Sequence, residues 1–320
     1  MTTASIYVSR LLTDRAMDRL RTVGHPVRVG AEAPPSRADL LAGIAGASAA
    51  VITLTERIDA EVLAAAGPQL SVIANVAVGY DNIDLDAAAA AGVTVTNTPG
   101  VLDRATADHT MALILACTRR VAEGDRFLRS REPWVWGPRM LVGLDISAGA
   151  TLGIMGYGRI GQAVARRAQA FDMKVVATAR SREPGTVEDG VSFVHTAELL
   201  AESDVVSVHT PLTAATRHLI DADALRAMKP TSYLINTARG GVVDEAALIT
   251  ALHEGWIRGA ALDVFEGEPQ VNPALLGAPG LVITPHTGSA GEATRDAMGL
   301  LAVDNAAAVL AGKPALTAVR

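Results

Sequence analysis

The chain has 320 residues, a length that suits two domains of ordinary size rather than one. Hydrophobic residues make up 49% of it and aromatic residues only 3%, so a sizeable aliphatic core is possible. The 28 basic and 34 acidic residues leave a net charge of −6, which argues against nucleic acid as a partner because its phosphates need a basic surface.

The cysteine count and the N-terminus narrow the protein class further. Cys117 is the only cysteine, so neither an intrachain disulfide nor a cysteine-rich metal site can form, and its apolar helical surroundings predict a buried side chain. No metal-ligand cluster stands out elsewhere, and we expect no metal. Polar residues interrupt the N-terminal apolar ones, so we expect no signal peptide, no membrane span and a cytoplasmic location.

Apolar, β-rich segments alternate with alanine-rich helical ones through the first third of the chain. The predicted strands are residues 5–9, 26–30, 50–54, 70–76 and 93–97. Helical segments such as 60–66 and 85–91 lie between them. This alternation predicts a parallel sheet covered by helices on both faces.

A second series follows a turn at Pro99-Gly100 and an apolar helix at about 106–121. Its predicted strands start at Thr151 and continue at 173–178, 192–194, 205–209, 233–236, 259–264 and 281–284. Two such series predict an α/β protein with two doubly wound parallel-sheet domains and a cleft between them. The joint is not a flexible linker, which suits hinged closure.

The start of the second series carries the most informative motif. Residues 151–155 form an apolar run that leads into Gly156, Gly158 and Gly161, and a helical pattern follows. Gly156 permits a tight turn, Gly158 lets the backbone approach a pyrophosphate, and Gly161 lets the helix pack close to the strand. The N–H groups of the helix's first turn then face the anion. The motif predicts a dinucleotide site in a Rossmann-type domain, which leaves the first domain to hold the substrate.

The end of the second strand of this domain indicates which dinucleotide binds. A cofactor with a free ribose 2′-hydroxyl usually meets a carboxylate there. This chain has Ala179 instead, followed by Arg180, Ser181 and Arg182. Two guanidinium groups suit a 2′-phosphate, because each can donate charge-assisted bidentate hydrogen bonds. We therefore expect NADP(H) as the preferred cofactor, with NAD(H) as the alternative.

Polar residues follow successive late strands of the same domain: Arg239, Glu268 and His286. The carboxyl ends of strands hold ligands in open parallel sheets. A guanidinium at Arg239 can bridge the carboxylate and the carbonyl of a 2-oxo acid. Glu268 beside His286 favours the imidazolium, which donates a proton in carbonyl reduction, and the neutral imidazole accepts one in alcohol oxidation.

These segments resemble the D-isomer-specific 2-hydroxyacid dehydrogenase family over nearly the whole chain. Besides the glycine triplet, the resemblance is carried by residues 75–84, 209–213, 236–240 and 284–286. It implies that Arg239 anchors and polarises the substrate, that His286 is the acid/base, and that Glu268 tunes and orients this imidazole.

The resemblance also implies how the domains are divided. In this family a C-terminal helix, here at about 290–311, crosses back to complete the first domain. Residues 1–99 and 290–320 would then form a flavodoxin-like substrate domain. Residues 100–289 would form the NAD(P)-binding Rossmann domain.

Further contacts are implied for substrate and cofactor. Val78 and Gly79 would present backbone N–H groups to the substrate carboxylate, which agrees with the way glycine exposes backbone to a ligand. Asp263 would contact the nicotinamide carboxamide, and Pro211 would lie near the adenosine. The other implied cofactor contacts are Arg159, Ile160, Thr210, Thr237, Ala238, His286 and Gly288.

Within the family, segments 180–182 and 53–59 resemble the glyoxylate/hydroxypyruvate reductase branch, in which Leu54 would line the substrate pocket. The expected reaction is NADPH-dependent reduction of small 2-oxo acids to D-2-hydroxy acids. The family also implies a homodimer with residues 123–144 as its arm. Trp136 resembles a tryptophan that some relatives lend to the neighbouring active site, the alternative being a plain interface aromatic.

Two positions depart from the family's pattern. Asp103 stands where relatives often have threonine, and His109 where they have an apolar residue. Both are expected near the hinge and the cofactor cleft. His109 is either a second ionisable group there or a helix histidine with its hydrogen bonds satisfied.

The sequence also allows functions other than the expected NADPH-dependent reductase. An NAD-dependent D-3-phosphoglycerate dehydrogenase, or another D-2-hydroxyacid dehydrogenase, would share the triad, although the former prefers an acid after the second strand and often appends a regulatory domain. Formate dehydrogenases replace the glutamate that is present here as Glu268. A different class, a dinucleotide-sensing corepressor-like protein, shares the fold, and the complete triad argues against it.

Overall fold

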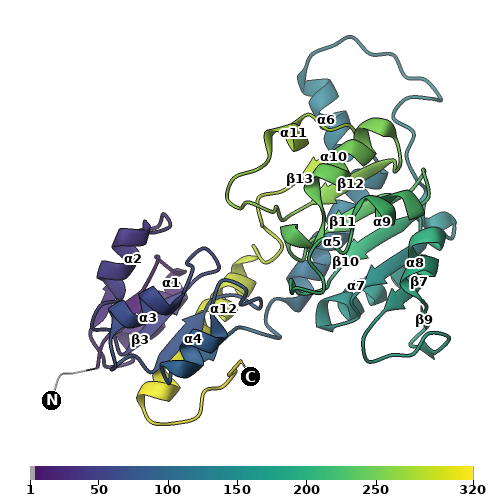
Figure 1. The fold of residues 1–320 in the computed structure, drawn as a ribbon. Coiled ribbons are helices and arrows are strands. Elements are labelled where there is room, and N and C mark those ends of the chain that lie inside the picture. The colour runs from purple at the N-terminus through teal and green to yellow at the C-terminus, as the bar shows by residue number, and fades with distance from the viewer. Residues whose placement is uncertain (1–3, 320) are drawn as a thin grey trace. The chain divides into compact units, whose positions relative to one another are not determined.

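The computed structural model describes residues 4–319. The chain forms two compact α/β units, each with its own internal contacts (Figure 1). Unit 1 comprises Met1–Leu102 and Ala290–Arg320, and unit 2 comprises Asp103–Ser289. Each unit has its own sheet and its own core.

Unit 1 has a five-stranded parallel sheet in the order β2-β1-β3-β4-β5, which is the flavodoxin-like order. The strands are β1 (Ile6–Val8), β2 (Val27–Val29), β3 (Ala49–Ile52), β4 (Val72–Asn75) and β5 (Thr94–Thr96). Every residue of β1, β3 and β4 is buried, as expected for strands covered on both faces. The strands predicted for this part of the chain are thereby confirmed.

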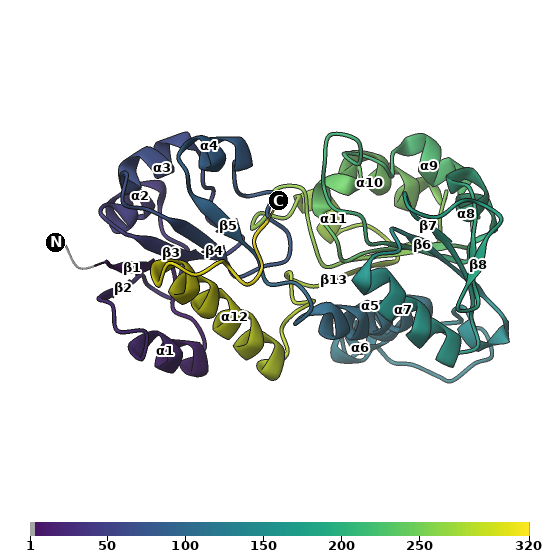
Figure 2. The same cartoon turned by 90° about the horizontal axis from the view of Figure 1, so that it is seen from below.

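Helices cover both faces of this sheet (Figure 2). They are α1 (Asp14–Arg21), α2 (Arg37–Ile44), α3 (Ala60–Ala66), α4 (Leu85–Ala90) and α12 (Glu292–Leu310). Helices α2, α3 and α4 pack on one face around a core that includes Ile52, Val62 and Ile73, whereas α1 and α12 pack together on the other. The last helix of the chain therefore belongs to the same sheet as its first strand.

Unit 2 has an eight-stranded sheet in the order β13-β12-β11-β10-β6-β7-β9-β8, parallel except for β8. The order around the glycine loop is that of a Rossmann fold. The strands are β6 (Thr151–Met155), β7 (Lys174–Thr178), β8 (Val187–Glu188), β9 (Val191–Phe193), β10 (Val205–Val208), β11 (Tyr233–Asn236), β12 (Gly259–Leu262) and β13 (Leu281–Ile283). All the predicted strands of the second series are present, and β8 is additional.

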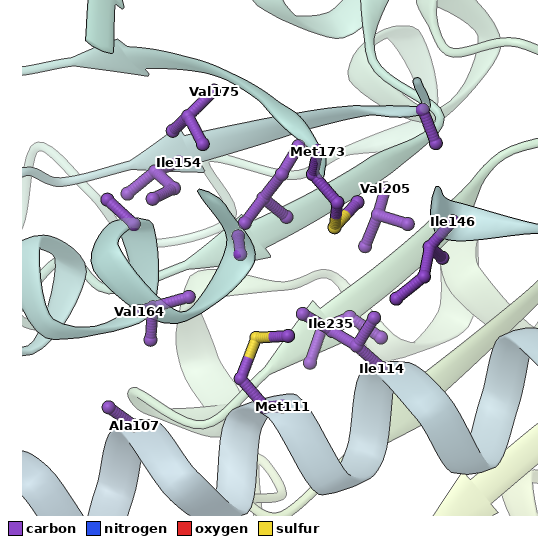
Figure 3. Close-up of a cluster of buried hydrophobic side chains, with 14 of the residues drawn as sticks. Ala107, Met111, Ile114, Ile146, Ile154, Val164, Met173, Val175, Val205 and Ile235 are labelled. Atoms are coloured by element: carbon purple, nitrogen blue, oxygen red, sulfur yellow. The ribbon is translucent and has the colours of Figure 1, made fainter. Parts of the chain in front are cut away.

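One face of this sheet carries α5 and α7, and the other carries α8, α9 and α10 (Figure 2). Figure 3 shows the core on the first face, where Met111 and Ile114 of α5 lie against Ile154 and Ile235 of the strands. The helices of unit 2 are α5 (Asp103–Thr118), α6 (Val121–Arg129), α7 (Arg159–Ala170), α8 (Thr196–Glu202), α9 (Ala222–Ala227), α10 (Glu245–Glu254) and α11 (Pro273–Leu276), with short 3₁₀ turns at Ile146–Ala148 and Gly240–Val242. Among residues 4–319, no helix combines the length and the apolar character needed to cross a membrane.

Helix α5 differs in its bounds from the prediction of 106–121. It begins at Asp103, which puts a carboxylate in the first turn, where the helix dipole favours negative charge. It ends at Thr118 because Arg120 takes a left-handed backbone conformation (φ 54°), after which α6 starts. Cys117 is buried in this helix, as predicted.

Candidate functional site

The glycine loop joins β6 to α7. Gly156 has a φ of +100°, a conformation that side chains disfavour, and a Cβ there would lie 2.8 Å from the carbonyl of His209. A Cβ on Gly161 would lie 2.3 Å from the carbonyl oxygen of Gly156, so this glycine lets α7 pack against the loop. At Gly158 a Cβ would meet nothing within 4 Å. The first and third glycines are thus required by the loop itself, whereas Gly158 borders open space.

These residues fit a dinucleotide. Gly158 is the N-cap of the twelve-residue helix α7 and gives it no side-chain cap, so the first-turn N–H groups remain for an anion. Arg159 is exposed in that first turn, and Ile160 is half-buried. Across the loop, the buried hydroxyl of Thr210 has no hydrogen-bond partner among residues 4–319. Pro211 next to it is exposed.

The basic segment after β7 contains an ion pair that the sequence did not reveal. Arg180 and Ser181 are exposed, whereas Arg182 donates to Glu188 of β8, with Nε 2.5 Å and Nη2 3.1 Å from the two carboxylate oxygens. The guanidinium lies 6.0 Å from the ring centroid of Phe193. No acid follows β7 directly in the sequence, but the hairpin of β8 and β9 brings the carboxylate of Glu188 to Arg182.

The loop after β11 holds Arg239 by its backbone. The fully buried amide of Asn236 donates to the carbonyl of Arg239 (2.9 Å) and accepts from the N–H of Ala238 (3.0 Å). The hydroxyl of Thr237 lies 2.9 Å from that of Thr110 on α5. A Cβ on Gly240 would overlap the Phe265 backbone, so only glycine fits directly after the arginine. The role of Asn236 could not be recognised in the sequence, although this residue lies in the segment 236–240 that carries the family resemblance.

Glu268 and His286 are brought together from the loops after β12 and β13. Glu268 Oε2 lies 2.6 Å from His286 Nδ1, and Oε1 accepts from the N–H of Phe265 at 2.8 Å. Both side chains are about one-quarter exposed, at 24% and 25%. A carboxylate on Nδ1 fixes the proton of that nitrogen and leaves Nε2 for acid/base work.

The backbone of His286 is itself unusual. Its φ is +52°, which is uncommon for a residue other than glycine, and its N–H donates to the carbonyl of Asp263 at 2.8 Å. The adjacent parallel strands β11, β12 and β13 end at the same edge of the sheet. Arg239, Glu268 and His286 thus follow neighbouring strand ends, as predicted from their positions in the sequence.

Asp263 is the buried hydrogen-bonding centre of this edge. Its carboxylate, 1% exposed, accepts from the Thr284 hydroxyl (2.6 Å), from the N–H groups of Thr287 (2.8 Å) and Gly288 (2.7 Å), and from His109 Nε2 (3.2 Å). Burial alone would raise the pKa of Asp263, but these donors outweigh burial and hold the pKa below its ordinary value. The carboxylate is therefore charged at neutral pH.

His109 and Gly288 both act on that carboxylate. His109 also lies 3.0 Å from the Thr284 hydroxyl, so its imidazole is anchored by two partners in the structure. This geometry agrees with both interpretations of His109: an ionisable group near the cofactor site, and a helix histidine whose hydrogen bonds are made within the protein. The N–H of Gly288 is used by Asp263, and a Cβ there would lie 3.1 Å from the same carboxylate.

Unit 1 places its predicted substrate residues in loops after β3 and β4. Two buried or half-buried asparagines hold the second loop: Asn75 donates to the carbonyl of Gly79 (2.9 Å) and Asn97 to that of Val78 (2.8 Å). The N–H groups of Val78 and Gly79 have no acceptor among residues 4–319. Leu54 is half-buried after β3. The loop therefore presents two adjacent amide donors.

The predicted arm exposes a row of apolar side chains. Beyond α6 the chain from 130 to 145 has neither helix nor strand. Its most exposed hydrophobic residues are Val135 at 89% and Trp136 at 76%. Trp136 makes no ring contact within the described residues, and three-quarters of its side chain is exposed.

Comparisons with known proteins identify the family. The NAD binding domain of the D-isomer specific 2-hydroxyacid dehydrogenases matches residues 111–288. A glyoxylate reductase of Thermococcus litoralis is 48% identical over 288 residues, which cover 88% of this chain and 86% of that protein.

Solved structures agree with this assignment. The crystal structure of a protein from Thermus thermophilus has a TM-score of 0.92 and 47% identity, covering 99% of this chain and 100% of the other. That of an NADPH-dependent glyoxylate/hydroxypyruvate reductase from Sinorhizobium meliloti, in complex with NADP and malonate, has a TM-score of 0.86 and 36% identity, covering 99% and 97%. The chain belongs to the D-isomer specific 2-hydroxyacid dehydrogenase family, and it is an NAD(P)-dependent oxidoreductase.

Proposed function

We propose that this protein reduces small 2-oxo acids to 2-hydroxy acids, glyoxylate to the achiral glycolate and hydroxypyruvate to the D-2-hydroxy acid, and that it prefers NADPH. The observation that best supports this reaction is the contact between Glu268 Oε2 and His286 Nδ1, which lie 2.6 Å apart. The two residues follow β12 and β13, the next two strands after Arg239. The choice of substrate is supported by the names of relatives, among them the Thermococcus litoralis and Sinorhizobium meliloti reductases.

The proposed catalytic residues are Arg239, Glu268 and His286. Arg239 binds the substrate carboxylate and draws charge from the carbonyl oxygen, which makes the carbonyl carbon more electrophilic. His286 Nε2 donates the proton to that oxygen as the alcohol forms. Glu268 keeps the imidazole oriented and stabilises its positive charge before the transfer.

The cofactor residues proposed in unit 2 are those of the glycine loop and the strand ends beyond it. Gly156, Gly158 and Gly161, with Arg159 and Ile160, would hold the pyrophosphate. The remaining contacts proposed are Arg180, Ser181, Arg182, Thr210, Pro211, Thr237, Ala238, Asp263, His286 and Gly288. A bound reduced nicotinamide supplies the hydride that the carbonyl carbon receives.

Preference for the 2′-phosphorylated cofactor is supported by the basic segment after β7. Arg180 is exposed there and Ala179 replaces the usual acid, so residues 179–182 offer a 2′-phosphate a cation and contain no carboxylate. Arg182 adds a second guanidinium, although Glu188 already holds it.

For unit 1 we propose the substrate-binding role. The adjacent N–H groups of Val78 and Gly79 suit a carboxylate. Both residues are held in place because Asn97 donates a hydrogen bond to the carbonyl of Val78 and Asn75 donates one to the carbonyl of Gly79. Leu54 would limit the size of the substrate side chain. Residues 1–99 with 290–320 would thus bind substrate and residues 100–289 the cofactor.

We also propose that the protein is a homodimer joined through the arm of residues 123–144. Its exposed apolar side chains include Leu128, Trp134, Val135, Trp136 and Val142. An apolar row of this kind on one segment marks an interaction site. Trp136 would then lie in the subunit interface or beside the neighbouring active site.

The deciding experiment follows the loss of reduced-nicotinamide absorbance with glyoxylate, hydroxypyruvate and a bulkier 2-oxo acid, each with NADPH and with NADH. Faster turnover of the small acids with NADPH is the expected result. Faster turnover with NADH overturns the cofactor preference, and a preference for the bulky acid, or oxidation of D-3-phosphoglycerate with NAD, overturns the substrate. No turnover with any pair, together with tight dinucleotide binding, would point to a sensing protein instead.

A further inference from the structure

The pair of Arg182 and Glu188 joins two segments that are neighbours only because of a hairpin. Glu188 lies in the edge strand β8, which pairs antiparallel with β9, and β9 pairs with β7. The turn between β8 and β9 is Asp189-Gly190, both with positive φ (50° and 74°). The carboxylate therefore reaches the end of β7 from outside the segment in which a ribose-binding acid is normally found.

Arg182 is held on several sides. Its Nε and Nη2 donate to both oxygens of Glu188, its Nη1 lies 3.2 Å from the hydroxyl of Ser181, and its guanidinium faces the ring of Phe193 at 6.0 Å. A bidentate pair of this kind is stronger than a single contact. Arg180, by contrast, is exposed and has no side-chain partner among residues 4–319.

The two arginines are therefore not equivalent for a ligand. The positive charge of Arg182 is balanced by Glu188, whose pKa the guanidinium holds below its ordinary value. A 2′-phosphate would have to compete with this carboxylate for the same N–H groups. A ribose 2′-hydroxyl carries no charge and does not depend on Arg182.

We propose that Glu188 is a specificity-determining residue that restrains the preference for NADP(H) over NAD(H) by occupying Arg182. Arg180 then supplies the larger share of 2′-phosphate recognition in the wild-type protein, and NAD(H) remains usable. The proposal rests on the cofactor subsite of the proposed function, and on no feature of the substrate.

The test measures binding without turnover, by calorimetry with 2′,5′-ADP and 5′-AMP at physiological ionic strength, on the full chain. Glu188→Gln keeps an acceptor at the same place and removes the charge. It should bind 2′,5′-ADP roughly two- to fivefold more tightly, the range expected for an exposed ion pair, with 5′-AMP unchanged. The matched control is Asp189→Asn, which removes the neighbouring charge without touching Arg182, at a positive φ that asparagine tolerates.

A double-mutant cycle assigns the effect to the arginine. Arg182→Ala should abolish the gain when it is combined with Glu188→Gln. Weaker 2′,5′-ADP binding by Glu188→Gln would mean that the carboxylate positions Arg182 for the phosphate, which overturns the proposal. An equal gain in Asp189→Asn, or a gain that survives Arg182→Ala, overturns it as well.

These outcomes are separate from those of the proposed function. A protein that fails to turn over 2-oxo acids but shows the gain in Glu188→Gln supports the inference and not the activity. A wild-type protein that binds 2′,5′-ADP and 5′-AMP equally, with a gain in Glu188→Gln, loses the proposed NADPH preference and keeps the inference. No gain in a variant with an unchanged unfolding temperature overturns the inference alone.

Discussion

His286 is the residue on which the proposed chemistry depends most directly. Its Nδ1 is held by Glu268 and its backbone by the carbonyl of Asp263, so Nε2 has a fixed position from which to transfer a proton. This arrangement needs a loop in which a non-glycine residue takes a φ of +52°. The strain is local, and the surrounding hydrogen bonds hold it.

His286→Gln should retain cofactor binding and lose catalysis. Glutamine keeps a polar side chain but cannot deliver a proton, so kcat should fall by roughly 10²- to 10⁴-fold. The measurement is kcat for NADPH oxidation with glyoxylate, beside NADPH binding followed by fluorescence. Glu268→Gln is the companion variant, with a smaller loss, because its Oε1 still accepts from Phe265. Normal turnover in His286→Gln would remove this residue from the mechanism.

The proposed catalytic residues could be identified in the sequence because each follows an apolar strand run and carries a chemically distinctive side chain. What could not be read there is how the loops are held. Asn236 fixes the loop of Arg239, and Asp263 gathers donors from Thr284, Thr287 and His109. The contacts of Asp263 join residues 21 or more positions apart, and the Asn236 contact depends on the backbone shape of its loop, so no spacing rule predicts them.

At the level of secondary structure, the strand predictions were confirmed and the short edge strand β8 was missed. Two residues are too few to show an alternating pattern. The signal that was available is the Asp189-Gly190 turn between Val187 and Val191, a dipeptide typical of tight hairpins. The end of α5 was placed too late for a similar reason, because the left-handed Arg120 carries no sequence signature.

Two alanine substitutions in the glycine loop should have different consequences, one for stability and the other for cofactor binding. Gly161→Ala places a Cβ 2.3 Å from the Gly156 carbonyl, so α7 must shift, and the free energy of unfolding should fall by about 1–3 kcal/mol. Gly158→Ala meets no atom and should fold normally, yet it fills the space that the pyrophosphate needs and should weaken NADPH binding about tenfold, equivalent to ~1.4 kcal/mol. Urea unfolding and calorimetry measure the two effects. Equal stability of the two variants would contradict the role given to Gly161.

The arm of residues 123–144 should determine the oligomeric state. Replacing Trp134, Val135 and Trp136 by serine removes side chains that are 52%, 89% and 76% exposed, so the folded chain itself loses little. Sedimentation equilibrium should show a dimer for the wild type and a monomer for the triple variant. A comparable triple substitution in α9, at the exposed or half-buried Ala222, Asp223 and Ala224, should leave the dimer intact. A wild-type monomer would exclude the dimer.

For the whole molecule, His209 should make stability depend on pH. Burial lowers its pKa from 6.5 to about 4, so the unfolded chain takes up a proton before the folded one as the pH falls. Stability that is present above pH 6.5 is then lost down to about pH 4. Between about pH 7.5 and 5 this amounts to about 2 kcal/mol, at 1.36 kcal/mol per pKa unit.

The check is the free energy of unfolding in urea at both pH values, compared with that of His209→Gln, which lacks the titrating group. Trp134, Trp136 and Trp256 all lie in unit 2, as does His209, so intrinsic fluorescence reports the unfolding of the relevant unit. An equal pH dependence in wild type and variant would contradict the prediction. The variant's lower stability at neutral pH is immaterial, because the comparison is of slopes.

The fold class was accessible from the sequence because alternating strand and helix signals allow few topologies, and the glycine triplet marks the Rossmann sheet. Periodicity alone could not assign α12 to unit 1, because a helix gives no indication of the sheet on which it packs. The helix is placed there by its packing against α1, β3 and β4, for which Gly299 leaves room beside Ala16.

That placement of α12 has a consequence for synthesis on the ribosome. Residues 103–289 are one uninterrupted stretch, so unit 2 can finish folding while translation continues. Unit 1 is the first to be synthesised, but its folding cannot be completed at that point. One face of its sheet remains incompletely covered until residues 292–310 leave the ribosome. During that interval the nascent chain exposes apolar strand surface, and this half of the protein is the one most in need of chaperone protection.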